Sequence, residues 1–399
     1  MHNRIMPHYR IRYTEEHLEK MANLWPVVGV VGARQVGKTT FLGNQLSFQS
    51  VSNLDEESIR SSAQASASGF LSSLEEPALI DEVQRVPKLF EALKLSVDKK
   101  RRPGRFFLTG SVSFSEGAGI RESLTGRIGV CHLHPLTLGE AHQLARPKIL
   151  PLKKQITTAM SPRIHPDSFS EALPLGGMPV PMFIRDPDQR KLYWQGWLST
   201  TILRDMARLF KRGFQPEFAY SLLEQIGKIL RNGELPTTAH FRSKSSRKLS
   251  AYLHAFEAIF VLRRLAPHDL GTGKTAWLPF DSGLGTYLAG NYLEEGARLS
   301  LSRILFLNEI SALFHATGEN FFPVYYKSPK AEPCDLVVQN IPIKIVPMSE
   351  LGSGPWGWYA SGVKAAAKKL GTKQGVLVAP ILKPVLEKDL VIAPWTLWS

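Results

Sequence analysis

The residues best suited to chemistry lie between Val27 and Thr40, where the chain reads V-V-G-V-V-G-A-R-Q-V-G-K-T-T. Two glycines, a lysine and a threonine stand at the spacing G-x-x-x-x-G-K-[ST], in which backbone N–H groups surround a phosphate chain. The lysine of such a loop reaches the β- and γ-phosphates, and the hydroxyl group binds Mg²⁺. We therefore predict a nucleotide site built from Gly32, Ala33, Arg34, Gln35, Val36, Gly37, Lys38, Thr39 and Thr40.

The segments on either side of this loop are the elements that must position it. Val27–Val31 is an apolar run without alternation, which is typical of a strand buried on both faces of a parallel sheet. The residues from Gly37 onward predict a helix, whose positive N-terminal end would face the phosphates. The sequence therefore predicts a strand, a phosphate loop and a helix in direct succession.

A pair of carboxylates follows the loop by about forty residues, at the end of the apolar run Ala78–Ile80. Asp81 is placed to hold the Mg²⁺ shell, and Glu82 to orient and polarise an attacking water. Such a pair is common at the ends of ordinary strands. Its position after a phosphate loop is what favours a nucleotide-hydrolysing site.

Three further polar residues are candidates for the same site. The run Phe106–Leu108 ends in Thr109 and Ser111, whose hydroxyl groups could bond the attacking water or the γ-phosphate, or cap a following helix instead. Arg127 follows Gly126 on an expected turn, where it could contact the γ-phosphate within its own chain or across a subunit interface. A solvated arginine is the alternative.

Composition limits the class of protein. The 399 residues are 43% hydrophobic and 21% charged, as in ordinary globular proteins. No stretch approaches the ~18 apolar residues of a membrane span, and the N-terminus has no apolar core of a signal peptide. Cys131 and Cys334 are far apart in sequence, so a disulfide framework is unsupported. These features predict a cytoplasmic protein.

The motifs occur in one order: G-A-R-Q-V-G-K-T-T from Gly32, N-L-D-E from Asn53, I-D-E-V-Q-R-V-P from Ile80, L-T-G-S from Leu108 and L-T-G-R from Leu124. Together they resemble the predicted prokaryotic ATPases of the AAA+ superfamily, type 14 group, over roughly residues 8–140. The resemblance implies that Asp81 and Glu82 are the Walker B pair. It also implies ATP with Mg²⁺ rather than GTP, and no guanine-reading N-K-x-D motif is present.

The resemblance extends to the rest of the chain and implies its organisation. We expect an α/β fold: a P-loop NTPase domain with a parallel sheet flanked by helices (1–145), a Pro- and Lys-rich linker (146–168), a helical, winged-helix-like module (169–290) and an α/β endonuclease-like domain (291–399). Within the second of these, G-G-M-P from Gly176 and the Arg204–Asp205 pair resemble recurring features of the family. We expect short helices at 220–230, 235–240 and 249–260.

The C-terminal domain resembles the restriction-endonuclease core. In active members of that class, a Glu, an Asp and a Glu-x-Lys motif bind metal and activate water. Here Glu309 and Asp335 stand in the first two places, but Lys344 and Val346 occupy the positions of the Glu-x-Lys motif. A lysine in place of a carboxylate repels the metal, and valine cannot replace the catalytic lysine. We predict that this domain does not cleave DNA.

Charge leaves a second functional hypothesis open. Residues 1–150 carry 19 Lys and Arg against 15 Asp and Glu, whereas the remaining residues carry 30 against 20. The leading hypothesis is a slow ATPase in which bound nucleotide controls the C-terminal domains. The alternative is a DNA-associated regulator that contacts the duplex backbone through its basic C-terminal half, including the stretch 241–248, which a solvated basic face also explains. A protein partner of this half is also possible, and the oligomeric state is left open.

Overall fold

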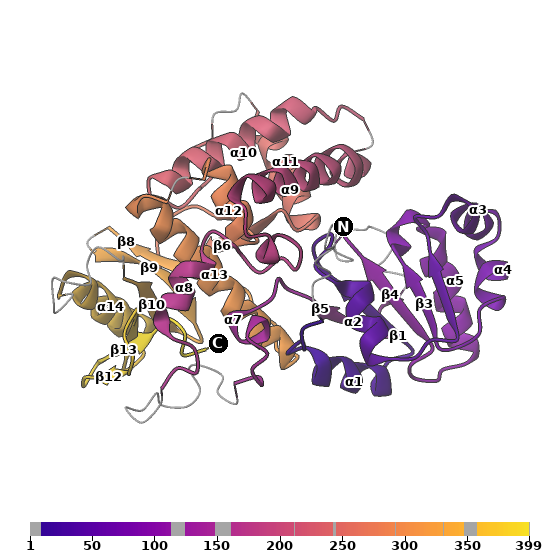
Figure 1. Cartoon of the computed structure of the whole chain (residues 1–399), viewed down its shortest axis with the longest axis horizontal. Helices are drawn as coiled ribbons and strands as arrows, with labels where there is room; N and C mark the ends of the chain where they lie inside the picture. The colour runs from indigo at the N-terminus through magenta and orange to yellow at the C-terminus, as the bar shows by residue number, and fades with distance from the viewer. Residues whose placement is uncertain are drawn as a thin grey trace.

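The computed structural model describes residues 9–112, 124–147, 161–210, 212–241, 245–291, 293–329, 331–346 and 357–398. The N-terminal part contains a five-stranded parallel sheet (Figure 1). Its strands, in spatial order, are β2 (Ser50–Asn53), β3 (Ala78–Asp81), β4 (Phe106–Gly110), β1 (Val27–Val31) and β5 (Ile128–His132). The carboxyl ends of β1, β3 and β4 therefore meet at one edge of the sheet.

Helices connect these strands and cover the sheet. They are α1 (Glu15–Leu24), α2 (Lys38–Gln45), α3 (Glu57–Ala65), α4 (Ala67–Ser72), the 3₁₀ turn η1 (Val83–Arg85), α5 (Lys88–Lys99) and α7 (Leu138–Ala141). All five residues of β1 are buried, as the apolar run predicted. Between Glu57 and Ser72 the chain forms two helices rather than one, because it is extended at Ser66, whose side chain caps α4 by accepting from Gly69 N.

The middle of the chain is mainly helical. Its elements are α8 (Pro166–Ala172), η2 (Pro181–Phe183), α9 (Pro187–Thr200), the π-helical turn η3 (Thr201–Met206), η4 (Ala207–Leu209), α10 (Pro216–Arg231), α11 (Ser246–Ala258), β6 (Leu262–Pro267), β7 (Ala276–Pro279) and α12 (Ser282–Leu288). The prediction of a helix at 235–240 was wrong. Thr237 instead forms an isolated bridge with Ala276, Pro236 O accepts from Trp277 N, and a turn follows in which His240 N donates to Thr237 O.

The C-terminal elements build a second, mixed sheet of eight strands, ordered β12-β13-β11-β10-β9-β8-β6-β7. They are α13 (Glu295–Ala316), β8 (Val324–Ser328), β9 (Ala331–Val338), β10 (Ile341–Ile345), α14 (Gly357–Leu370), β11 (Gly375–Ala379), β12 (Val385–Leu386) and β13 (Leu390–Pro394). Because β6 pairs with β8, this sheet crosses the domain boundary expected at residue 290.

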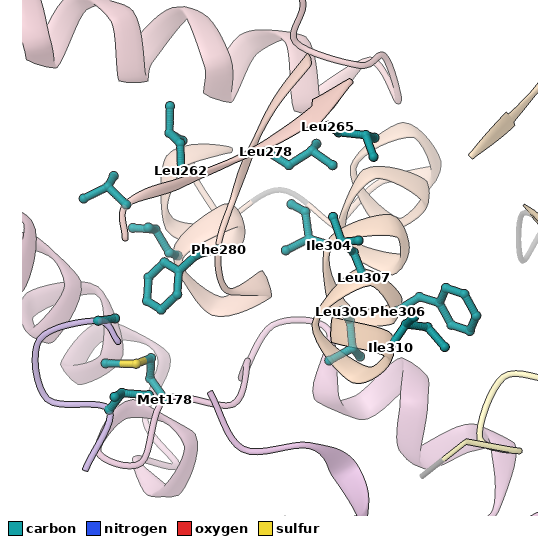
Figure 2. Packing of buried hydrophobic residues seen from close by; sticks show 14 of the residues in the cluster. Met178, Leu262, Leu265, Leu278, Phe280, Ile304, Leu305, Phe306, Leu307 and Ile310 are labelled. Atoms are coloured by element: carbon teal, nitrogen blue, oxygen red, sulfur yellow. The ribbon is translucent and has the colours of Figure 1, made fainter. Parts of the chain in front are cut away.

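The long helix α13 joins the two halves and lies between them (Figure 1). Most of its length is buried, and Ile304 and Leu307 pack with Leu265 and Leu278 of the β6–β7 hairpin (Figure 2). Further along α13, Glu309 Oε1 accepts a hydrogen bond of 2.9 Å from Leu138 N, at the start of α7. One core therefore connects the N-terminal sheet to the C-terminal part. No helix among the described residues is long and apolar enough to cross a membrane.

Candidate nucleotide site

The loop between β1 and α2 has the conformation that its glycines allow. Gly37 has a φ of 97°, a left-handed value that a side chain would strain, and it directly precedes the first residue of α2. Val36 N donates to Ala33 O over 3.2 Å, which closes the turn. Residues 32–37 therefore curl at the N-terminus of α2, where backbone N–H groups and the helix dipole favour an anion.

Lys38 lies inside this turn and is only 6% exposed. Its Nζ atom donates to Gly32 O and to Ala33 O, each over 3.0 Å. Burial lowers the pKa of the ammonium, and the charges of Glu82 and Asp81 partly oppose this effect. Two neutral carbonyl groups thus hold the ammonium at the mouth of the loop. Phosphate oxygens can replace these carbonyl groups, and their negative charge would then neutralise the positive charge of Lys38.

Asp81 stands opposite the start of α2, at the end of β3. Thr39 Oγ1 donates to Asp81 Oδ2 over 3.0 Å, and Thr109 Oγ1 contacts Asp81 Oδ1 from the neighbouring strand β4. A hydroxyl and a carboxylate oxygen side by side are the ligand types that Mg²⁺ prefers. The donor set of Thr39 and Asp81 therefore fits the metal expected from the sequence.

Glu82 follows with a φ of 57°, which is uncommon for a residue with a side chain. Its carboxylate accepts from Ser111 Oγ over 3.0 Å and from Gln84 Nε2. Gln84 Nε2 also lies 3.1 Å from Ser111 Oγ, and Gln84 Oε1 is buried without a hydrogen-bond partner among the described residues. The structure thus brings Glu82 and Ser111 together, and a left-handed backbone at such a position is typical of functional sites.

Arg127 does not join this group within its own chain. It precedes β5, and the register pairs Ile128 with Val27, so Arg127 lies at the amino end of the sheet. Its guanidinium forms an ion pair with Asp98, with Nε–Oδ1 and Nη2–Oδ2 distances of 2.7 and 2.9 Å. The expectation that Arg127 meets the γ-phosphate in its own chain is therefore wrong, because the phosphate loop is at the opposite end of β1. A role across a subunit interface stays a prediction.

The structure adds residues from the middle of the chain that the sequence did not place at the site. Trp197 Nε1 on α9 donates to Arg34 O over 3.0 Å, and Tyr193 OH donates to Gln35 Oε1 over 2.9 Å. Arg34 also pairs with buried Asp205 of η3 over 3.3 Å. The recurring Arg204–Asp205 pair was the only sequence signal for this contact, because about 170 residues separate the partners.

The C-terminal carboxylates are not arranged as a metal site. Asp335 pairs with Arg303 Nε at 2.7 Å and with Lys344 Nζ at 3.6 Å, and it accepts from Ile345 N. Glu309 was expected beside Asp335 but contacts Leu138 instead, because six residues along α13 place it about 120° around the helix from Arg303. Among the described residues no group of three or more His, Cys, Asp or Glu could hold a metal ion.

Part of the chain is similar to known proteins. The family model for an AAA domain (AAA_14) matches residues 25–142. Two relatives, uncharacterized protein Mb2031c of Mycobacterium bovis and uncharacterized protein Rv2008c of Mycobacterium tuberculosis, are each 28% identical over 258 residues. The aligned region is 62% of this chain and 52% of each relative, so the chain spans about half the length of the curated relatives it matches.

Two solved structures resemble the chain more remotely. The Walker-type ATPase PABY2304 of Pyrococcus abyssi has a TM-score of 0.41 at 15% identity, covering 69% of this chain and 94% of its own. The RuvB protein of Thermotoga maritima, as a point variant, has a TM-score of 0.29 at 20% identity, covering 63% and 86%. The family match, the parallel sheet and the phosphate loop together support an AAA-type ATPase domain in residues 25–142.

Proposed function

We propose that the protein binds ATP with Mg²⁺ at the loop of residues 32–40, hydrolyses it slowly, and uses the bound state to control its C-terminal part. One observation carries this proposal. Lys38, Thr39, Asp81 and Glu82 meet at one edge of the sheet, with the ammonium, the metal-type oxygens and the water-orienting carboxylate in adjacent places. This arrangement has the parts that phosphoryl transfer needs.

Each residue has a defined part in the proposed reaction. The loop N–H groups and Lys38 bind and orient the triphosphate, and Thr39 and Asp81 would hold Mg²⁺. When bound there, Mg²⁺ would supply positive charge that neutralises the phosphates. Glu82 orients a water and accepts its proton, while Ser111 and Gln84 hold the Glu82 carboxylate in position. Thr109 positions Asp81.

A cavity of about 100 Å³ beside Gly37 is the proposed place of the nucleobase. It is bounded by the N-terminal segment, by α2 and by η2. Its lining residues are Tyr9, Arg10, Arg12, Val36, Gly37, Thr40, Phe41, Leu136, Pro179 and Phe183. The Arg10 guanidinium lies 5.2 Å from the ring centroid of Phe183, so an aromatic ring and a planar cation lie together in the cavity wall, and the base is proposed to stack on this pair.

Replacing Phe183 with alanine tests the place of the base. We expect Phe183→Ala to weaken ATP binding about five- to 150-fold, because loss of one stacking contact costs roughly 1–3 kcal/mol. Binding of inorganic tripolyphosphate, which has no base, should stay unchanged. Fluorescence competition measures both affinities, with Phe322→Ala, an exposed aromatic, as the matched control. Equal losses for ATP and tripolyphosphate would refute a base contact.

The proposed switch rests on contacts between the loop and the middle of the chain. Gly176, at a φ of 69°, allows the turn Gly176–Pro179 to approach Asp281, which accepts from Gly177 N over 2.7 Å. Pro179 at the other end of this turn lies against Gly37. Asp281 also caps α12. A change at the phosphate loop can therefore be passed through this turn to the C-terminal core.

DNA binding by the basic C-terminal half is a second proposal, supported by its excess of positive charge. The basic stretch 241–248 includes Arg242 and Lys244, which lie outside the described residues. Lys248 Nζ lies 4.1 Å from the Phe218 ring centroid and contacts Gln215, so this charge is already engaged. The expected winged-helix-like and endonuclease-like folds remain proposals.

If duplex DNA binds, its affinity should fall steeply with salt. For four phosphate contacts, the slope of log affinity against log salt would be about −3.6. Fluorescence anisotropy with labelled duplex, at salt concentrations from about 50 to about 300 mM, which include physiological ionic strength, measures this slope. Binding that is insensitive to salt would contradict a backbone contact.

The duplex should remain uncut in Mg²⁺, because Arg303 and Lys344 occupy the Asp335 carboxylate. Mg²⁺-dependent cleavage that is lost in Asp335→Ala would contradict an inactive domain.

A further inference from the structure

A cluster of three arginines and two carboxylates lies beside the phosphate loop. Arg34 comes from the loop, Arg85 from η1 after the Asp81–Glu82 pair, and Arg204 from η3. All three converge on Asp55, at the end of β2: Arg204 Nη2 lies 2.9 Å from Asp55 Oδ2, Arg34 Nη2 lies 3.7 Å away, and Arg85 is in contact. Asp205 is the second carboxylate. We call these five residues the arginine cluster.

The arginine cluster is not electrically neutral. Three guanidinium groups face two carboxylates, which leaves one positive charge in excess beside a loop built to hold phosphates. Burial opposes the ionisation of Asp55, but the hydrogen bond from Arg204 and the charges of Arg85 and Arg204 hold the pKa of its carboxyl below the ordinary value. The cluster therefore favours a further anionic group, and the anion nearest to Arg34 in a nucleotide complex is the triphosphate.

The three arginines differ in how firmly they are held. Arg34 is fixed by buried Asp205, and its carbonyl is bound by Trp197. Arg85 is 11% exposed, whereas Arg204 is 31% exposed and Asp55 is 26% exposed. The Arg204–Asp55 pair is thus the most solvent-accessible link of the cluster.

Arg204 also lies on an unusual piece of backbone. Residues 201–206 form a π-helical turn at the end of α9, and π-helical turns occur frequently at functional sites. This turn presents Arg204 toward Asp55 while Asp205 points to Arg34. Adjacent residues therefore hold both the loop and the end of β2.

We propose that Arg204 is the arginine that contacts the γ-phosphate of ATP bound in its own chain, and that Asp55 is the carboxylate with which the γ-phosphate competes for it. This inference rests on the proposed function and assigns the triphosphate sensor of that site. Exchange of Asp55 for phosphate releases the link between η3 and β2. The presence of the third phosphate is thereby communicated to α9 and the residues that follow it.

The test compares ATP and ADP, which differ in the group that Arg204 is proposed to contact. Affinities of the full chain for ATP and ADP with Mg²⁺ are measured by calorimetry for the wild type, Arg204→Gln, Asp55→Asn and the control Arg212→Gln. Arg212 is an exposed arginine further along the chain and is not a member of the arginine cluster. Arg204→Gln should weaken ATP binding about tenfold or more, as for loss of a charge-assisted hydrogen bond, with ADP binding within about twofold.

The other variants complete the design. Asp55→Asn should raise the ratio of ATP to ADP affinity, because it removes the competing carboxylate, and Arg212→Gln should leave the ratio unchanged. Equal effects of Arg204→Gln on both nucleotides, or an effect of Arg212→Gln as large as that of Arg204→Gln, would overturn the proposal. If circular dichroism shows that Asp55→Asn does not fold, the comparison of the two arginine variants tests the proposal without it. Failure of the wild type to bind either nucleotide would refute the proposed function instead.

Discussion

Replacing Lys38 with alanine is expected to abolish measurable binding of ATP with Mg²⁺. The Lys38 ammonium is buried at the mouth of the loop and, within the described part of the chain, donates to two backbone carbonyls, so phosphate oxygens are its natural charged partners. Hydrogen bonds to charged groups contribute roughly 1.5–3 kcal/mol each, so losing contacts to two phosphates should weaken binding at least about a hundredfold. Ligand-induced stabilisation in thermal unfolding, which follows from mass action, should disappear.

The control for this variant is Lys99→Ala, which removes an exposed lysine from α5. It should unfold and bind ATP as the wild type does. Lys38→Ala should itself stay folded, because burial already disfavours the charged form of this lysine, as its lowered pKa reflects. ATP binding and hydrolysis by Lys38→Ala at wild-type levels would contradict the assignment of the phosphate loop.

Replacing Glu82 with glutamine should separate hydrolysis from binding. Glutamine retains the shape of the side chain and its contacts with Ser111 and Gln84, but it cannot accept a proton. Loss of a general base costs about 10²–10⁴-fold in rate. We therefore expect single-turnover hydrolysis of ATP to slow by at least a hundredfold on that scale, while the affinity for ATP changes little.

The matched control for the carboxylate is Glu91→Gln, at an exposed position of α5. Quench-flow or thin-layer assays of labelled ATP measure the single-turnover rate in each variant. If Glu82→Gln hydrolysed ATP as fast as Glu91→Gln, Glu82 would not be the residue that activates water. Loss of binding in Glu82→Gln would point instead to a structural role.

The phosphate loop and the acidic pair could be predicted from sequence because their geometry is local. The strand, the glycines, the lysine and the threonine lie within fourteen consecutive residues, and backbone preferences alone bring them together. Asp81 and Glu82 follow a buried strand, so a parallel sheet brings them to the same edge as the loop. The strand order, with β4 between β1 and β3, then places Thr109 and Ser111 beside these carboxylates.

Arg127 could not be placed from sequence, because its position depends on which end of a strand it adjoins. It precedes β5 rather than following it, and in a parallel sheet the two ends of a strand lie on opposite edges. Glu309 was misplaced for a related reason. The sequence fixes its helix, but the face that a residue presents depends on how the helix packs against β9 and α7.

The contacts that α9 and η3 make with the phosphate loop could not be predicted from local sequence patterns. Trp197 and Asp205 contact the loop only because the middle of the chain folds back onto the N-terminal domain. Two aromatic residues of α9, Trp194 and Trp197, are buried in the core. The indole N–H of Trp197 nevertheless bonds the loop, so a core residue can also position a site.

A structure of the full chain with a non-hydrolysable ATP analogue and Mg²⁺ tests the central claim most directly. We expect the triphosphate within the turn of residues 32–37, with Lys38 on its terminal phosphates and Thr39 and Asp81 beside the metal. Arg204 should have left Asp55 for the γ-phosphate. An analogue bound elsewhere, or one whose phosphates do not contact Lys38, would contradict the account.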